Sequence, residues 1–317
     1  MKNTRRKFIK NLAASSIVIP FSNELIFAEK ISNKNKYPIN FFSKPIDKFG
    51  MDFIIDTLKM AGLDGVDLTV RPKGSVLPEK VEEDLPKFAE LAKKRDLLLE
   101  MMVTNITSAE SPYARKLLSV AANHGINNYR MGYYKYNDNE SAKQTIKRAE
   151  SGILSLIELN KKVGIQGGYQ NHTGNYFGSP IWDLLTVLKG TKGKWINSQF
   201  DIYHAYAEGY RSWPISMEMI ANKIGSFAIK DFNWKKLNQK ARLIKVPLGQ
   251  GVVDLDGFFN TIKKLKIVAP ISLHIEYPLL NQSEEQLPIL AKQKIIVNKI
   301  KNEVRFIRLK LSQHQII

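Results

Sequence analysis

The residues best suited to chemistry in this 317-residue chain lie in four short segments, each after an apolar, β-branched run. The segments span residues 169–172, 200–204, 229–232 and 274–277. They carry carboxylate, imidazole, amide and ammonium groups, which transfer protons and stabilise developing negative charge. Polar clusters at the ends of successive strands are typical of an active site on the C-terminal face of a (β/α)8 barrel.

Two carboxylates, Asp201 and Glu276, each follow an apolar run that is predicted to be a strand. Carboxylate oxygens are suitable ligands for Mg²⁺ or Mn²⁺, and a buried carboxylate needs a metal or another partner. Two structural alternatives remain open. Asp201 could cap the helix that follows it, and Glu276 could form a structural salt bridge. We favour a functional role for both residues.

Histidine and amide side chains accompany these carboxylates. The amide oxygen of Gln170 can bind a hard cation but brings no charge. His172 lies two residues further on, so it shares the face of Gln170 if the strand continues. His172 could bind substrate or act as an acid or base near neutral pH, or it could be a hydrogen-bonded supporting residue. His274 shares the face of Glu276 by the same alternation.

Lys230 precedes Asp231 at the end of another predicted strand. Its ammonium group could stabilise a developing enolate. A buried lysine could also have a lowered pKa and serve as a base. A salt bridge between Lys230 and a neighbouring carboxylate is an equally open alternative.

Further polar and aromatic residues at or near strand ends are predicted to contact the substrate through hydrogen bonds or an apolar wall. They are Asp67, Arg71, Asn105, Arg130, Asn171 and Trp234. Large aromatic side chains are more often packing residues than ligand contacts, so each assignment is individually weak evidence.

Short apolar runs alternate with longer amphipathic runs along the chain, which indicates repeated β-α units and a parallel sheet. The predicted strands are 39–42, 65–70, 97–103, 126–131, 165–170, 195–200, 226–230 and 271–275. The predicted helices are 47–61, 78–94, 109–123, 143–163, 181–188, 217–223, 255–265 and 289–311. This order predicts one α/β domain at 37–317, a (β/α)8 TIM barrel, with 232–251 as a β-hairpin lid.

The four segments resemble those of the xylose-isomerase-like TIM barrels, the sugar phosphate isomerase/epimerase family. That family places Glu, Asp, His and Glu at the ends of strands five to eight, around one divalent metal. Asp201 and Glu276 match the pattern, whereas Gln170 and Ala228 stand where Glu and His are usual. The resemblance implies a weakened Mn²⁺ or Mg²⁺ site formed by Gln170, Asp201 and Glu276.

The same resemblance implies a small-molecule sugar or sugar derivative as substrate and proton abstraction next to a carbonyl, through an enediolate. It makes Glu276 the first choice as base and places His204 against the sugar, with His172 and Lys230 as the other catalytic candidates. We therefore predict a sugar isomerase/epimerase-like enzyme. The alternatives are a lyase or dehydratase acting on an oxidised (keto) sugar, and a non-catalytic sugar-binding barrel that has lost its metal.

The net charge of +18 raises the question of nucleic-acid binding, but the positive charge is mostly lysine spread along the chain. DNA-binding relatives with the suspected fold use several metals held by many histidines, and this chain has five histidines. We therefore predict no nucleic-acid partner. The chain has no cysteine and so no disulfide framework. Its oligomeric state is not indicated by the sequence.

The amino terminus matches a twin-arginine export signal, with Arg5-Arg6-Lys7-Phe8-Ile9-Lys10 followed by an apolar stretch at 12–21. That stretch is too short to span a bilayer stably, since about 20 apolar residues are needed. We predict a signal peptide at 1–28, a linker at 29–36, and a periplasmic mature protein. The weaker alternative is a basic amphipathic helix.

The export prediction can be tested with the double variant Arg5→Lys and Arg6→Lys. This variant should accumulate in the cytoplasm, because the paired arginines are the feature of the signal that the export route reads. Fractionation and immunoblotting provide the measurement. Unchanged export of the double variant would show that the twin-arginine interpretation is wrong.

Overall fold

The computed structural model describes residues 36–191 and 194–317, and these residues form a closed barrel of eight parallel strands. In chain order the barrel strands are β1 (Ile39–Phe42), β2 (Gly65–Thr69), β3 (Leu98–Val103), β4 (Asn128–Arg130), β5 (Gln166–Gln170), β6 (Ile196–Asp201), β7 (Ile224–Ile229) and β10 (Ile271–Leu273). Each strand pairs with the next, and β10 closes the ring by pairing with β1. The predicted TIM barrel is therefore confirmed.

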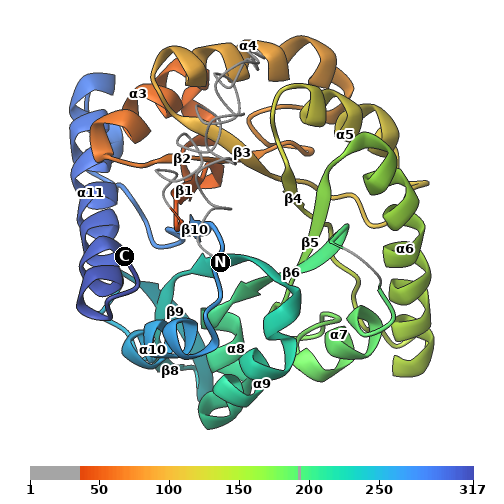
Figure 1. Ribbon diagram of the computed structural model, residues 1–317. Coiled ribbons are helices and arrows are strands. Elements are labelled where there is room, and N and C mark those ends of the chain that lie inside the picture. The colour runs from red at the N-terminus through yellow and green to blue at the C-terminus, as the bar shows by residue number, and fades with distance from the viewer. Residues whose placement is uncertain (1–35, 192–193) are drawn as a thin grey trace, which may run out of the picture. The chain divides into compact units, whose positions relative to one another are not determined.

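Helices surround the barrel, and the view along its axis shows them as an outer ring (Figure 1). They are α3 (Met51–Ala61), α4 (Val81–Lys94), α5 (Ala114–Asn123), α6 (Ala142–Val163), α7 (Ile181–Leu188), α8 (Ile202–Gly209), α9 (Trp213–Ile220), α10 (Leu255–Leu265) and α11 (Ile289–Gln313). The last helix, α11, packs beside α3 and so joins the two ends of the barrel domain.

Local signals in the sequence explain where the helices begin and end. Helix α6 begins with a capping box, in which Ser141 and Gln144 satisfy each other's backbone N–H groups. It ends at Gly164, whose φ of 80° lies in the left-handed region that favours glycine. Its core-facing positions, among them Ile153 and Leu156, are fully buried against the barrel.

The sequence did not predict α8, which begins directly after β6 and spans only eight residues. Asp201 provides its N-cap, because Asp201 Oδ1 accepts a hydrogen bond from the His204 backbone N–H at 3.2 Å. The capping role considered for Asp201 is therefore real, but it uses only one carboxylate oxygen. The other oxygen, Oδ2, faces the barrel mouth.

The predicted hairpin follows β7, and its antiparallel strands are β8 (Asp231–Leu237) and β9 (Lys240–Val246). Asp231 anchors it. The Asp231 carboxylate accepts backbone hydrogen bonds from Phe232 at 2.8 Å, Gly249 at 3.0 Å, Gly251 at 3.0 Å and Val253 at 3.2 Å. A side chain at Gly251 would collide with this carboxylate, since its Cβ would lie 2.0 Å from Asp231 Oδ1. The hairpin is thus tied down at its base.

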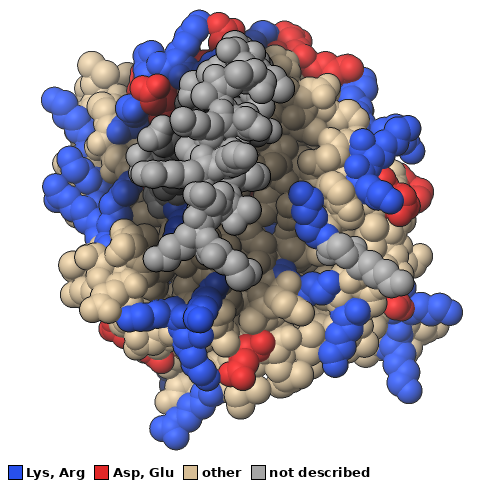
Figure 2. Space-filling view, viewed as in Figure 1, with Lys and Arg blue, Asp and Glu red and all other residues tan. Residues whose placement is uncertain are grey.

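The surface charge is distributed as the sequence suggested. Lys and Arg side chains are spread around the viewed face and interspersed with acidic residues (Figure 2). No described helix combines the length and the apolar character needed to cross a membrane. The predicted signal peptide and most of the linker lie outside the described residues.

We expect the substitution Asp231→Ala to lower the free energy of unfolding by about 3–5 kcal/mol. It would leave four backbone donors without their charged acceptor, and a loss of more than about 4–5 kcal/mol from one substitution is exceptional because the freed donors partly regain solvent. Urea denaturation provides the measurement. The matched control is Asp254→Ala, which removes one carboxylate that caps α10 through Gly257 N–H and should cost about 1 kcal/mol. Equal losses in the two variants would contradict the anchoring role.

Candidate active site

A buried lysine lies between two carboxylates at the C-terminal end of the barrel. Lys230 Nζ is 3.2 Å from Asp201 Oδ2 and 3.1 Å from Glu276 Oε1. The ammonium group also lies 5.0 Å from the centre of the Tyr203 ring, which favours a cation. Lys245, from β9 of the hairpin, reaches Glu276 Oε2 at 3.6 Å. We call Asp201, Lys230 and Glu276 the charged triad.

The amide of Gln170 extends the charged triad on the β5 side. Gln170 Nε2 donates to Asp201 Oδ2 at 2.7 Å, and Gln170 Oε1 accepts from Arg130 Nη1 at 2.9 Å and from the Tyr133 hydroxyl. The two donors on Oε1 fix the orientation of the amide. Gln170 therefore links Arg130 to the carboxylate as a neutral bridge.

The pKa values of the charged triad follow from burial and mutual attraction. Burial acts to lower the pKa of Lys230, but the charges of Asp201 and Glu276 outweigh it and hold that pKa well above its ordinary value. Burial acts to raise the pKa of Glu276, but the Lys230 charge and hydrogen bonding hold it far below its ordinary value. The resting site therefore contains an ammonium and an ionised Glu276 at neutral pH.

Two adjacent histidine rings, His172 and His204, lie next to the charged triad with their centroids 4.0 Å apart and their planes tilted by 32°. The Thr173 backbone N–H donates to His204 Nδ1 at 3.1 Å, so the proton of neutral His204 lies on Nε2. The Thr173 carbonyl accepts from His172 Nδ1 at 2.9 Å, so Nε2 of neutral His172 carries a lone pair. One ring is therefore a donor at Nε2, and the other is an acceptor.

Both rings are neutral at physiological pH. Burial lowers the pKa of His172 to about 4, and burial together with the Lys230 charge lowers that of His204 well below its ordinary value. His204 Nε2 has no hydrogen-bond partner among the described residues and lies 3.6 Å from Asp201 Oδ2. His204 is thus a fixed neutral donor directed toward the charged triad.

His274 connects Glu276 to a deeper polar layer of the barrel. His274 Nδ1 lies 3.8 Å from Glu276 Oε1, and Nε2 lies 3.1 Å from Ser272 Oγ. Ser272 in turn donates to Asp67 Oδ2 at 2.6 Å. Burial raises the pKa of Asp67 to about 6 and lowers that of His274 to about 3. His274 therefore lies between Glu276 and the polar layer formed by Ser272 and Asp67.

Arginines and aromatic rings line the β1–β4 side of the barrel mouth. Arg71 and Arg130 both lie 5.6 Å from the centre of the Phe42 ring, and Arg130 is 5.1 Å from that of Tyr133. The sequence analysis named the two arginines as substrate-contacting residues, but it did not predict that both would lie over the Phe42 ring. The signal was available, because Phe42 is the last residue of the first strand.

The structure brings most of the predicted site residues together but separates some from the rest. The residues joined through the contacts described above are Asp67, Arg130, Gln170, His172, Asp201, His204, Lys230 and Glu276. The Asn171 side chain bonds both the N–H and the carbonyl of Asp201, so it positions that residue. Asn105 is exposed, and Trp234 is 53% exposed on the hairpin, where it contacts Phe232.

The donor set at the charged triad does not fit a divalent metal. The Lys230 ammonium group is within hydrogen-bond distance of both carboxylates, Gln170 directs its nitrogen rather than its oxygen at Asp201, and Ala228 has no ligand atom. Among residues 36–191 and 194–317, no group of three or more His, Cys, Asp or Glu side chains is arranged to hold a metal ion. The metal role of Gln170, Asp201 and Glu276 stays a prediction, and lysine supplies the positive charge at this position.

Comparison with a family model places the chain among known proteins. A model described as a xylose isomerase-like TIM barrel matches residues 55–293. The chain therefore belongs to this family, as the strand-end segments predicted. A search of curated protein sequences found no match.

Solved structures with the same fold include sugar epimerases and a dehydratase. D-allulose 3-epimerase from Methylomonas sp. is 14% identical with a TM-score of 0.65, covering 87% of this chain and 98% of that chain. An L-ribulose 3-epimerase is 13% identical with a TM-score of 0.63, covering 88% and 96%. The probable 3-DHS dehydratase AsbF from Bacillus anthracis is 14% identical with a TM-score of 0.62, covering 84% and 97%. At these identities the likeness shows the fold.

The buried neutral His274 should make stability depend on pH in a defined direction. The unfolded chain binds a proton at this residue below about pH 6.5, but the folded protein does so only near pH 3. The contribution of His274 to stability is therefore lost as the pH falls, at about 1.4 kcal/mol per unit at most. Asp67, whose pKa is raised, acts in the opposite sense and must be separated from it.

The measurement is the difference in free energy of unfolding between the wild type and His274→Asn, from urea denaturation between pH 4 and 7. We expect this difference to decline by about 1 kcal/mol per unit as the pH falls. Parallel curves for the two proteins would mean that folded His274 takes up its proton near the ordinary pKa.

Proposed function

We propose that this protein is an acid–base enzyme of the isomerase/epimerase kind that removes a proton from a carbon beside a carbonyl on a sugar or sugar derivative. The observation that carries the proposal is the Lys230 ammonium group, which is held between Asp201 and Glu276 where the barrel strands end. A fixed cation in a buried site stabilises an enolate oxygen far better than a solvated one does.

Glu276 is the proposed base because a substrate can reach it. Its side chain is 24% exposed, whereas those of Asp201 and Lys230 are 0% and 4% exposed. A substrate oxygen that draws the Lys230 hydrogen bond away from Glu276 raises the pKa of that carboxylate, because the charge that lowered it is then shared. Substrate binding would therefore make Glu276 a stronger base.

The proton transfer then balances within the site. The carbon-bound proton passes to the Glu276 carboxylate, and the electron pair moves onto the carbonyl oxygen. The Lys230 ammonium group stabilises the resulting enolate. The Nε2–H of His204 and the Nε2 lone pair of His172 offer one donor and one acceptor for substrate oxygens. Return of the proton to the neighbouring carbon, with transfer of a hydroxyl proton between the two oxygens, completes isomerisation. Epimerisation instead requires a second acid to deliver a proton to the opposite face of the same carbon.

A lyase or dehydratase begins with the same proton transfer, and the similar structure of a probable 3-DHS dehydratase supports that outcome as a second candidate. Export to the periplasm rests on the paired arginines at positions 5 and 6. The non-enzymatic alternative is a barrel that binds a sugar without catalysing a reaction.

The decisive test follows deuterium from solvent into the substrate. Wild-type protein is incubated in D₂O with free sugars, sugar acids and keto glycosides, and exchange is read by NMR and mass spectrometry. We expect exchange at the carbon beside the carbonyl, and Glu276→Gln should slow it by at least about 10²-fold because general base catalysis contributes about 10²–10⁴-fold. Glu218→Gln, which changes an exposed glutamate on α9, is the matched control.

The same assay with a chelator tests the source of the positive charge. Exchange should persist with chelator and should be lost in Lys230→Gln, whereas loss on chelation would favour the metal predicted from the family. Tight binding of a sugar without any exchange would replace the enzyme with the sugar-binding alternative.

A further inference from the structure

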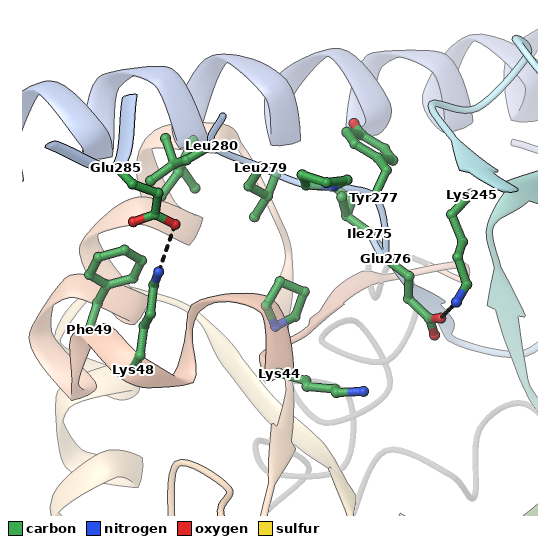
Figure 3. A pocket seen from close by; sticks show the side chains of 13 residues that line it. Lys44, Lys48, Phe49, Lys245, Ile275, Glu276, Tyr277, Leu279, Leu280 and Glu285 are labelled. Atoms are coloured by element: carbon green, nitrogen blue, oxygen red, sulfur yellow. Dashed lines mark hydrogen bonds and ion pairs between the residues drawn. The ribbon is translucent and has the colours of Figure 1, made fainter. Parts of the chain in front are cut away.

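A cavity of about 400 Å³ adjoins the charged triad and shares Glu276 with it. Lys245, the hairpin partner of Glu276, lines the same end of the cavity (Figure 3). The cavity is built from the segments that follow β1 and β10, with α11 behind them. A molecule in this cavity is therefore continuous with the group that we propose as the base.

The described walls of the cavity combine a cluster of apolar side chains with five charged ones, Lys44, Lys48, Lys245, Glu276 and Glu285. Six of its lining residues are Pro45, Phe49, Ile275, Leu279, Leu280 and Ile296. Tyr277 adds a ring, and its hydroxyl is already engaged as a donor to Glu303. Within the part of the chain that the structure describes, the polar lining side chains other than Tyr277 are Lys or Glu.

The charges in the cavity are largely paired. Lys48 and Glu285 form an ion pair at 2.8 Å away from the Glu276 end, and Lys245 pairs with Glu276 (Figure 3). Lys44 has no ion-pair partner among residues 36–191 and 194–317, and its side chain extends toward the Glu276 end (Figure 3). Among the described residues, the cavity thus places a cluster of apolar side chains beside ion-paired charges, with the Lys44 ammonium group unpaired near the junction with the active site.

We propose that this cavity is an aglycone subsite, which binds an apolar or aromatic ring attached to the sugar that reaches Glu276. The assignment rests on the proposed function for the position of the sugar. A volume of about 400 Å³ lies in the range of small-molecule sites, whose walls are mainly apolar with a few polar groups. A second sugar would bring several hydroxyls that need hydrogen-bond partners, and four of the five charged side chains in the described lining are already engaged in ion pairs.

An aglycone subsite restricts the substrate to glycosides, which is a narrower class than the sugars that could undergo the proposed reaction. A glycoside has its anomeric carbon blocked by the aglycone, so it carries no free aldehyde or ketone there. The carbonyl that acidifies the neighbouring proton must then be a keto group elsewhere on the sugar ring. The reaction that supplies this substrate is accordingly an oxidation of a ring hydroxyl.

Binding measurements test the subsite without any turnover. Calorimetry on the wild-type protein compares phenyl and methyl glycosides of glucose, galactose and xylose in both anomers. We expect at least one phenyl glycoside to bind about tenfold or more tightly than its methyl counterpart, because only the phenyl ring removes apolar surface from water. Glucosyl-glucose disaccharides serve as the arm for a second sugar.

Two variants at the exposed Lys44 test whether the preference for phenyl glycosides arises in this cavity. Lys44→Trp places a bulky ring in the cavity and should abolish the phenyl preference, whereas Lys44→Gln keeps the cavity open and should retain it. A phenyl preference that survives Lys44→Trp, equal binding of phenyl and methyl glycosides, preferential binding of disaccharides, or no binding at all would each overturn the subsite. The deuterium-exchange assay with free sugars is a separate measurement. A negative binding result would therefore contradict the subsite but not the proposed reaction, and absence of exchange would contradict the reaction independently of the binding result.

Discussion

The site depends on one electrostatic constraint, which is that the Lys230 ammonium group must be neutralised inside a barrel that excludes water. Asp201 and Glu276 provide that neutralisation from the two strands' ends on either side of β7. Removal of one partner from a buried ion cluster leaves an uncompensated charge and is strongly destabilising. The Gln170 amide and the neutral histidines add no charge to this balance, whereas Lys245 adds a second ammonium group beside Glu276.

Gln170 and Ala228, which depart from the family pattern, fit the charge balance and the space around Asp201. A second glutamate at position 170 would place another negative charge beside Asp201, and a histidine at 228 would add bulk where Asp201 pairs with β7. With Gln170 and Ala228 in those places, one lysine satisfies two carboxylates.

The sequence predicted the barrel because each strand is a short apolar run between amphipathic helices, and all eight strands lie within a few residues of their predicted bounds. It singled out Asp201, Lys230 and Glu276 because each lies at or just after the end of a strand, but it left open whether Lys230 pairs with a carboxylate. It missed α8, because the helix is short and its cap is the same Asp201 that serves the site. It could not show that Lys245 reaches Glu276, since that contact depends on how the hairpin folds back. Nor could it assign the histidine tautomers, which are set by backbone atoms of Thr173.

That role of Thr173 gives the site a built-in polarity. A single residue uses its N–H on one imidazole and its carbonyl on the other, so two adjacent rings of the same chemical type present opposite faces to the substrate. In the proposed reaction, a sugar that reached both Nε2 atoms would offer a lone pair to His204, whose Nε2 is buried beside Asp201, and a hydrogen to His172. In the reversed orientation, a hydroxyl hydrogen of the sugar would face the Nε2–H of His204 and an oxygen lone pair would face the Nε2 lone pair of His172. The backbone at this one position can thereby distinguish which way round a nearly symmetrical diol lies, before any bond is broken.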